Sequence, residues 1–275
     1  MADDSELFIF FILLFAAGLF IYKWYKPIFS IWVPDRRKTG KIVLASLPIV
    51  SFVIMLVTLK TIASYDVVDN FFFIFFYILM GYAWLLVGVY VITALFDLSP
   101  VDDIIVLDNK AASIAFAGGF IGITLIYSGA NIGDGPGWWC VVFAGGLGCV
   151  AWAVLALIIN ALTQVFERVS VDRDISCSIR LGSYLLSSGI ILGRASAGDW
   201  TSGWKTIVEF AAAWPVLLPA VFIVLFERVA AKTPKGRDTK NEWLSGSVVF
   251  GIFIIVFAVL SVIFLSPLPQ NPMYT

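Results

Sequence analysis

Apolar positions fall in eight long runs, separated by shorter polar connections. A helix needs about 20 apolar residues to cross the roughly 30 Å hydrocarbon core of a membrane. The pattern therefore predicts an all-α integral membrane protein with eight transmembrane helices. These helices are expected over Leu7–Tyr22, Ile42–Leu59, Phe71–Phe96, Ala111–Ser128, Trp138–Phe166, Ser176–Gly193, Thr206–Phe226 and Trp243–Leu265.

The basic residues gather on one side of the predicted helices. All of the 18 Lys and Arg residues except Lys60, Arg194 and Lys205 lie in or next to connections that follow odd-numbered helices. Because cytoplasmic connections carry the excess of Lys and Arg, this distribution predicts that both termini lie outside. The acidic start "MADDSE" precedes the first apolar run, so that run is expected to be an uncleaved signal anchor.

Related segments recur along the chain. "VFERV" at Val165–Val169 recurs as "LFERV" at Leu225–Val229, and "LFDLSPVDDI" at Leu95–Ile104 is a looser copy. We therefore expect three tandem hairpins of the same orientation, which join the second and third, fourth and fifth, and sixth and seventh helices. The predicted parts are a signal-anchor helix with a basic loop over 1–41, a divergent first hairpin over 42–107, two hairpin repeats over 108–229, and a basic loop with a last helix over 230–275.

Two of the predicted helices carry glycines four residues apart. Gly118 and Gly122 lie in the fourth helix, and Gly189 and Gly193 lie in the sixth. This spacing lets helix backbones approach closely in a membrane. The glycines are expected to pack helices together, either within one chain or between the subunits of a homo-oligomer.

Two of the predicted outer connections resemble each other, "GDGPGWW" at 133–139 and "GDWTSGW" at 198–204. One interpretation is structural, with tight turns in which Asp134 and Asp199 cap the helices that follow. Four tryptophans would then serve as anchors at the membrane interface, because their rings are apolar with one polar edge. They are Trp138, Trp139, Trp200 and Trp204.

The alternative interpretation of these connections is a site. Arg194 lies on the same predicted face and would reach Asp134 or Asp199 as a partly buried ion pair or solute contact. Glu209 joins this group one turn inside the seventh helix. Ionisable groups within a membrane are costly, which makes them candidates for function.

Three further segments allow two interpretations each. "KWYKPIFSIWVPDRRKTGK" at 23–41 is typical of contact with anionic lipids or of charge that only sets topology. "DLSPVDDIIVLDNK" at 97–110 is expected to be a solvated connector or a docking patch for a cytoplasmic protein. In the seventh helix, Pro215 and Pro219 either open the backbone beside a cavity or serve packing alone.

The middle of the chain resembles a known family. "NKAASIAFAGGFIG" and "VDRDISCSIRLGSYLLSSGIILGRASAGDW", within residues 108–200, are similar to the uncharacterised bacterial inner-membrane family represented by the YjfL proteins. The most specific part is "GIILGRASAGDW" at 189–200. The resemblance implies a multi-pass protein of the bacterial inner membrane, encoded near envelope-stress proteins and polyamine-modifying enzymes. It implies no catalytic residues, and it leaves out the first hairpin and the eighth helix.

Composition narrows the chemistry further. The chain is 60% hydrophobic and 13% charged, whereas about a quarter of residues are charged in soluble domains. It contains no His, which excludes His metal ligands and His general bases. The three cysteines, at 140, 149 and 177, form no CxxC pair and are expected to be small hydrophobes.

No catalytic motif, metal site, cofactor site or nucleic-acid-binding pattern is recognisable, so we expect no enzyme. We expect a non-catalytic accessory or scaffold protein of an envelope-stress system, which acts through partner or lipid binding. The alternative is a channel or transporter for a small solute or ion, with its outer mouth formed by the two GD-containing connections.

Overall fold

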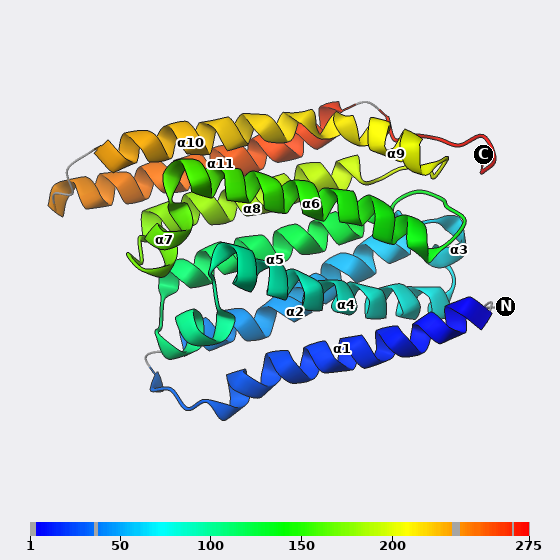
Figure 1. The fold of residues 1–275 in the computed structure, drawn as a ribbon, viewed down its shortest axis with the longest axis horizontal. Coiled ribbons are helices and arrows are strands. Elements are labelled where there is room, and N and C mark those ends of the chain that lie inside the picture. The colour runs from blue at the N-terminus through cyan, green and yellow to red at the C-terminus, as the bar shows by residue number, and fades with distance from the viewer. Residues whose placement is uncertain (1–3, 36–37, 233–236, 266, 275) are drawn as a thin grey trace.

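The protein is described by a computed structural model that covers residues 4–35, 38–232, 237–265 and 267–274. These residues form helices and no strands, and eight of the helical stretches are long and apolar enough to cross a membrane (Figure 1). The predicted all-α class and the number of spans are thereby confirmed. The spans are α1 Asp4–Ser30, α2 Thr39–Thr61, α4 Phe71–Phe96, α5 Lys110–Ala130, α6 Trp138–Thr163, α8 Ile175–Ala195, the series α9 Gly203–Glu209, η3 Phe210–Val216 and α10 Leu217–Lys232, and α11 Arg237–Phe264.

Both ends of the described chain lie at the same end of the helical bundle, together with α9 and the short helix α3, Tyr65–Val68 (Figure 1). We call this the outer end and the opposite one the inner end, in keeping with the predicted orientation. Which end faces the cytoplasm stays a prediction, because it rests on the distribution of Lys and Arg.

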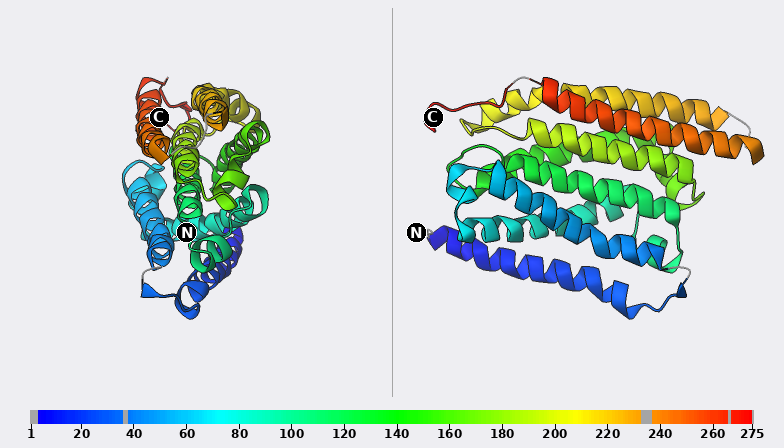
Figure 2. Two further views of the ribbon diagram at one scale, coloured as in Figure 1. Left: turned by 90° about the vertical axis from the view of Figure 1, so that its left-hand side faces the viewer. Right: turned by 180° about the vertical axis from the view of Figure 1, so that it is seen from behind.

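Helices α5 and α8 form the centre of the bundle and lie side by side, with α1 at one edge and α10 and α11 at the other (Figure 2). In the apolar window of each central helix 67% of the residues are buried, more than in any other span. Glycines permit this contact. A Cβ added to Gly118 would overlap the backbone of Gly182, and one added to Gly129 would overlap that of Gly193.

The other predicted packing glycines lie along the same contact. A Cβ on Gly122 would overlap the carbonyl of Leu185, and one on Gly189 would overlap Gly122 itself. Gly193 faces the backbone of Leu125 as well as that of Gly129. The structure therefore places both GxxxG pairs between two helices of one chain.

The seventh span is broken, in contrast to the single helix that its apolar run predicts. α9 ends at Glu209, a 3-10 segment runs through Pro215, and α10 begins at Leu217. Proline lacks a backbone N–H and crowds the preceding turn, so an α-helix cannot run through it without distortion. The interruption lies at Pro215, one of the two prolines for which one interpretation expected an opened backbone, while Pro219 lies in the first turn of α10.

The acidic connection at 97–110 is not the solvated connector that one interpretation expected. It contains a π-helical turn, η2, Pro100–Val106, which buries Ile104 and Ile105 against the bundle. A Cβ on Gly40 would collide with Ile104, which shows how closely η2 approaches α2. Partial burial raises the pKa of Asp103, although the backbone N–H of Ser99 opposes this shift by donating to its carboxylate. Docking of a protein partner at this connection stays a prediction.

The two inner connections on either side of α5 have matching backbones. Both contain a short helix flanked by non-glycine residues with positive φ: Asp97 and Asp108 flank η2, while Gln164 and Arg173 flank α7, Val165–Ser170. An Asx cap then begins the next long helix, Asn109 for α5 and Asp174 for α8. The two matching connections link α4 to α5 and α6 to α8, whereas the predicted hairpins pair the spans differently. The three-hairpin arrangement therefore stays a prediction.

Candidate functional site

The two GD-containing connections pack directly against each other at the outer end. Gly133 and Gly198 both have positive φ, and a Cβ on Gly133 would overlap the backbone of Gly198. The backbone N–H of Gly198 donates to the Ile132 carbonyl at 2.8 Å. The backbone N–H of Trp200 donates to the Asp134 carbonyl at 2.7 Å. Glycine is required here because the turns need a left-handed backbone and leave no room for a side chain.

The carboxylates of these connections join segments that are distant in the sequence. Asp199 Oδ1 accepts the backbone N–H of Asp134 at 2.8 Å, and its Oδ2 accepts that of Asn271 at 3.0 Å. Asp134 Oδ1 accepts the backbone N–H of Tyr65 at 3.2 Å. The prediction that the two aspartates cap the helices that follow them is wrong. Gly137 precedes α6 without a side-chain cap, and Ser202 caps α9.

The other charged residues of the predicted site are arranged differently. The ion pairs among the described residues do not include one between Arg194 and either Asp134 or Asp199. Glu209 lies 3.7 Å from Lys205, one helical turn away, in a half-exposed pair. Exposed pairs of this kind contribute little to stability.

The four tryptophans do not share one environment. Trp200 packs its ring edge-to-face on Trp139 at 4.8 Å between ring centroids, and on Phe143 at 5.4 Å. Trp138 is half-buried, whereas Trp204 is 76% exposed. Trp200 therefore lies within the packing of the outer connections, while Trp204 projects from the surface as an interface anchor would.

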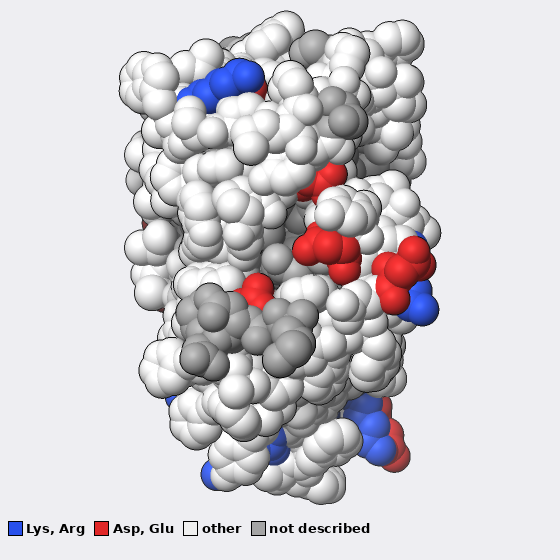
Figure 3. All heavy atoms as spheres, turned by 90° about the vertical axis from the view of Figure 1, so that its right-hand side faces the viewer, with Lys and Arg blue, Asp and Glu red and all other residues white. Residues whose placement is uncertain are grey.

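A cavity of about 210 Å³ opens beside the GD-containing connections. Its lining contains five carboxylates and no Lys or Arg among the described residues, and Figure 3 shows acidic side chains gathered on this face. The five are Glu6, Asp66, Asp134, Asp199 and Glu209. Walls of one charge sign concentrate the field and raise the local concentration of cations.

The segment 267–274 crosses the outer end and is bonded to the second GD-containing connection. The backbone N–H of Asp199 donates to the Pro269 carbonyl at 2.9 Å, and Asn271 Nδ2 donates to the Trp200 carbonyl at 2.7 Å. Asn271 is buried, and Tyr274 contributes to the cavity lining. We call this segment the outer strap.

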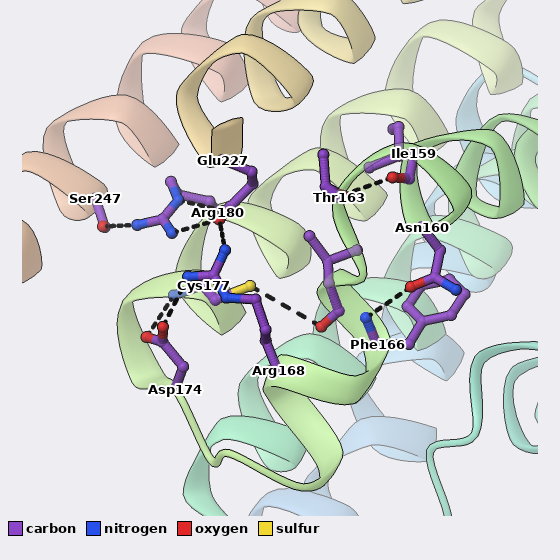
Figure 4. Close-up of polar contacts among 11 residues, drawn as sticks. Ile159, Asn160, Thr163, Phe166, Arg168, Asp174, Cys177, Arg180, Glu227 and Ser247 are labelled. Carbon is purple, nitrogen blue, oxygen red and sulfur yellow. Dashed lines mark hydrogen bonds and ion pairs between the residues drawn. The ribbon is translucent and has the colours of Figure 1, made fainter. Parts of the chain in front are cut away.

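A second polar group lies near the inner end, inside the bundle. Arg180 of α8 and Glu227 of α10 are each 1% exposed. They form a two-point ion pair, from Nε to Oε1 and from Nη2 to Oε2, the latter at 2.9 Å (Figure 4). Arg180 Nη1 donates to the Ser247 hydroxyl of α11, so the pair connects three spans. The guanidinium carbon also lies 4.9 Å from the centre of the Phe226 ring.

Arg168 of α7 extends this ion-pair network toward the inner connection. Its Nη1 donates to Glu227, and its Nη2 donates to Asp174 at 2.8 Å. Asp174 Oδ1 accepts the backbone N–H of Cys177 at 3.0 Å and so caps α8. Burial by itself would raise the pKa of Asp174, but the Cys177 N–H and the Arg168 guanidinium outweigh it and hold this pKa below its usual value. The network therefore contains two guanidinium groups and two carboxylates, and its charges cancel.

A match to a protein family covers part of the chain. The model of the family described as Domain of Unknown Function (DUF350) matches over residues 42–176. These residues are similar to the DUF350 domain. Searches of curated proteins and of solved structures find no match.

The DUF350 match begins with α2, so it includes the 42–107 region that the family resemblance left out. It ends at the start of α8, and thus contains Asp134, Arg168 and Asp174. Arg180, Glu227 and the outer strap lie beyond the matched residues. The outer cavity and the ion-pair network therefore each combine residues inside the match with residues of the spans that follow it.

The sequence analysis did not predict the ion-pair network near the inner end. Arg180 was counted among the charges of a connection, but it lies within α8 and is buried. Glu227 belongs to the repeated "LFERV" segment, whereas its counterpart Glu167 in "VFERV" is exposed. An acidic residue directly at the end of the seventh apolar run was the available signal. Its partner is 47 residues away in the sequence, and only the packing of α8 against α10 brings them together.

Polar side chains continue along α8 from this network toward the middle of the bundle. Arg180, Tyr184 and Ser187 follow at helical spacing on one face, and all three are buried. The Tyr184 hydroxyl and the Ser187 hydroxyl have no hydrogen-bond partner within the described structure. Buried polar atoms are nearly always bonded to protein or to water, so these two hydroxyls lack the partners that buried polar groups usually have. No group of three or more Cys, Asp or Glu side chains suited to a metal ion occurs among the described residues.

Proposed function

We propose that this protein is a channel or transporter for a small cation or cationic solute, with its outer mouth formed by the two GD-containing connections. The observation that carries the proposal is the outer cavity, because five carboxylates and no basic residue line it in the described chain. Such a cavity attracts cations and repels anions. Its place between the connections that join spans, on the surface of an eight-span bundle, suits an entrance.

The remainder of the proposed path follows α8. This helix carries the buried Arg180, Tyr184 and Ser187. Its last residue, Ala195, and the Ser196 that follows it line the outer cavity. At 1.5 Å per residue, Arg180 lies about 24 Å along the helix from Ser196, which is most of the membrane thickness. The broken seventh span packs against α8, and interrupted helices are common beside transport sites.

The inner ion-pair network closes this path in the present conformation. Arg180 and Glu227 hold α8, α10 and Ser247 of α11 together near the inner end. Passage of a solute requires these helices to separate there. The ion pairs would then break, and water would hydrate the separated charges. On this proposal, the path is open at the outer end of the bundle and closed at the inner end.

Replacing Asp134 with Asn is expected to lower cation flux into liposomes that contain the purified protein by roughly fivefold. One charge beside the solute contributes on the order of 1 kcal/mol. Asn keeps the oxygen that accepts the Tyr65 N–H, so the fold should be retained. Flux of potassium and of a polyamine is followed with ion-sensitive dye and radiolabelled solute.

Asp97→Asn is the matched control, because Asp97 is an exposed carboxylate at the inner end of α4 and Asn tolerates its left-handed backbone. Equal flux in both variants would contradict the role of the cavity. Absence of flux in the unaltered protein, together with a co-purified cytoplasmic partner, would assign it instead to the accessory or scaffold proteins that the family resemblance suggests.

Replacing Asn271 with Ala is expected to raise flux about threefold, if transport proceeds through the outer cavity. The change removes the bond to the Trp200 carbonyl and the one from the Met273 N–H, each worth roughly 1 kcal/mol, so the outer strap detaches more often. Met273→Ala is the control within the same strap, because Met273 is 86% exposed. Limited proteolysis should show faster cleavage of the strap in Asn271→Ala alone. Unchanged cleavage and flux would show that the strap is not held by this residue.

A further inference from the structure

A second cavity, of about 140 Å³, lies toward the inner end among α1, α2, α4 and η2. Its lining is apolar except for Lys23 and Tyr90. The apolar lining residues include Phe20, Trp24, Leu44, Leu86 and Ile105. This cavity is separate from the outer cavity and from the ion-pair network, which involve other residues.

Water is a poor occupant of such a space, since a buried water needs two to four polar partners and the lining offers few. The helix on one side, α1, is only 22% buried in its apolar window, so this edge of the bundle faces the surroundings. Tyr90 is exposed at the cavity rim. In a membrane, the surroundings that can enter an apolar recess of this kind are lipid chains.

The rim carries positive charge. The Lys23 ammonium donates to the Tyr90 hydroxyl at 2.8 Å and lies 5.6 Å from the centre of its ring. An ammonium has three N–H donors, so this bond leaves two for another acceptor. Lys26, one turn further along α1, is also exposed and lies over the Tyr22 ring at 5.2 Å. Lysines near helix ends extend their amines toward lipid headgroups.

The acidic residues of η2 do not occupy this rim position with their carboxylates. Asp102 Oδ2 accepts the hydroxyl of Ser99 at 3.0 Å, and Asp103 Oδ2 accepts its backbone N–H at 2.7 Å. Both carboxylates therefore cap the start of their own helical turn. The two cavity-lining residues of η2 that precede them, Pro100 and Val101, are apolar.

We propose that this cavity binds a segment of one acyl chain of an anionic phospholipid whose phosphate contacts Lys23, with Lys26 adding to the attraction. The apolar lining accounts for the chain, and the ammonium on the rim accounts for the headgroup charge. This site is independent of the transport proposal, because no residue is shared with the outer cavity or with the α8 stripe.

The test uses the full-length protein in vesicles of phosphatidylcholine that contain either a fluorescent phosphatidylglycerol or a fluorescent phosphatidylcholine. Energy transfer from protein tryptophans reports bound lipid, and Trp24 lies in the cavity lining. Phosphatidylglycerol should bind preferentially, and Lys23→Gln should lower that preference about fivefold, which is the effect of one basic residue near a charged surface. Lys23→Arg should retain it.

Lys110→Gln is the matched control, because Lys110 is an exposed lysine at the inner end of α5 outside the cavity. Val89→Phe should fill the recess and lower binding of both lipids, and it tests the chain site separately from the headgroup contact. Equal binding of both lipids by the unaltered protein, or equal losses in Lys23→Gln and Lys110→Gln, would overturn the proposal.

Discussion

Replacing Glu227 with Gln is expected to destabilise the folded protein by about 3–5 kcal/mol. The change removes the carboxylate that pairs with both Arg180 and Arg168. Arg180 is 1% exposed, so its charge would stay buried beside the Ser247 hydroxyl and a neutral amide, with no carboxylate to pair with. The measurement is the thermal unfolding midpoint of the detergent-solubilised protein.

Glu167→Gln is the control for this change. Glu167 occupies the same place in "VFERV" that Glu227 occupies in "LFERV", but its side chain is exposed, so less than about 0.5 kcal/mol should be lost. A double variant, Arg180→Met with Glu227→Met, should recover much of the stability, since apolar residues replace a buried pair without leaving a charge unpaired. Similar midpoints for Glu227→Gln and Glu167→Gln would contradict the assigned network.

Replacing Gly118 with Ala is expected to cost about 3 kcal/mol, at the upper end of overpacking effects. The new methyl group would overlap the carbonyl oxygen, the carbonyl carbon and the Cα of Gly182. These are backbone atoms and cannot rotate away. Helices α5 and α8 must therefore move apart along the centre of the bundle. The loss should appear as a lower unfolding midpoint and as a lower yield of folded protein.

Gly146→Ala in α6 is the control, because a Cβ at Gly146 meets no atom within 4 Å. Alanine has the higher helix propensity, so this variant should be neutral or slightly stabilised. If Gly118→Ala matched it, the close contact of α5 with α8 would be incorrect.

The number of spans was predictable because membrane crossing depends on a local property, the length of an apolar run. The seventh span shows the limit of that signal. Its run from Thr206 to Phe226 is continuous in apolar character, and the break around Pro215 is visible only as a proline whose effect depends on its neighbours. The connection at 97–110 was expected to be solvated because it is acidic. The burial of Ile104 and Ile105 depends on tertiary packing, which its charges do not reveal.

The candidate sites divide in the same way. The similarity of the two GD-containing connections drew attention to Asp134 and Asp199, and the structure brings these residues together. Their bonding was not predictable, because each carboxylate accepts N–H groups from segments 65 to 72 residues away. The ion pair predicted between Arg194 and these aspartates rested on opposite charge alone, and opposite charge does not determine whether two side chains lie close together.

The sequence by itself determined the all-helical class, the eight spans and the glycines that permit close packing, since these follow from local composition and spacing. The tertiary structure alone decided which polar groups meet. It buried Arg180 against Glu227, left the corresponding Glu167 exposed, and turned the GD-containing connections into one wall of a carboxylate-lined cavity. Burial and pairing of charge depend on contacts between distant segments, and a single carboxylate is costly or harmless according to what the fold places beside it.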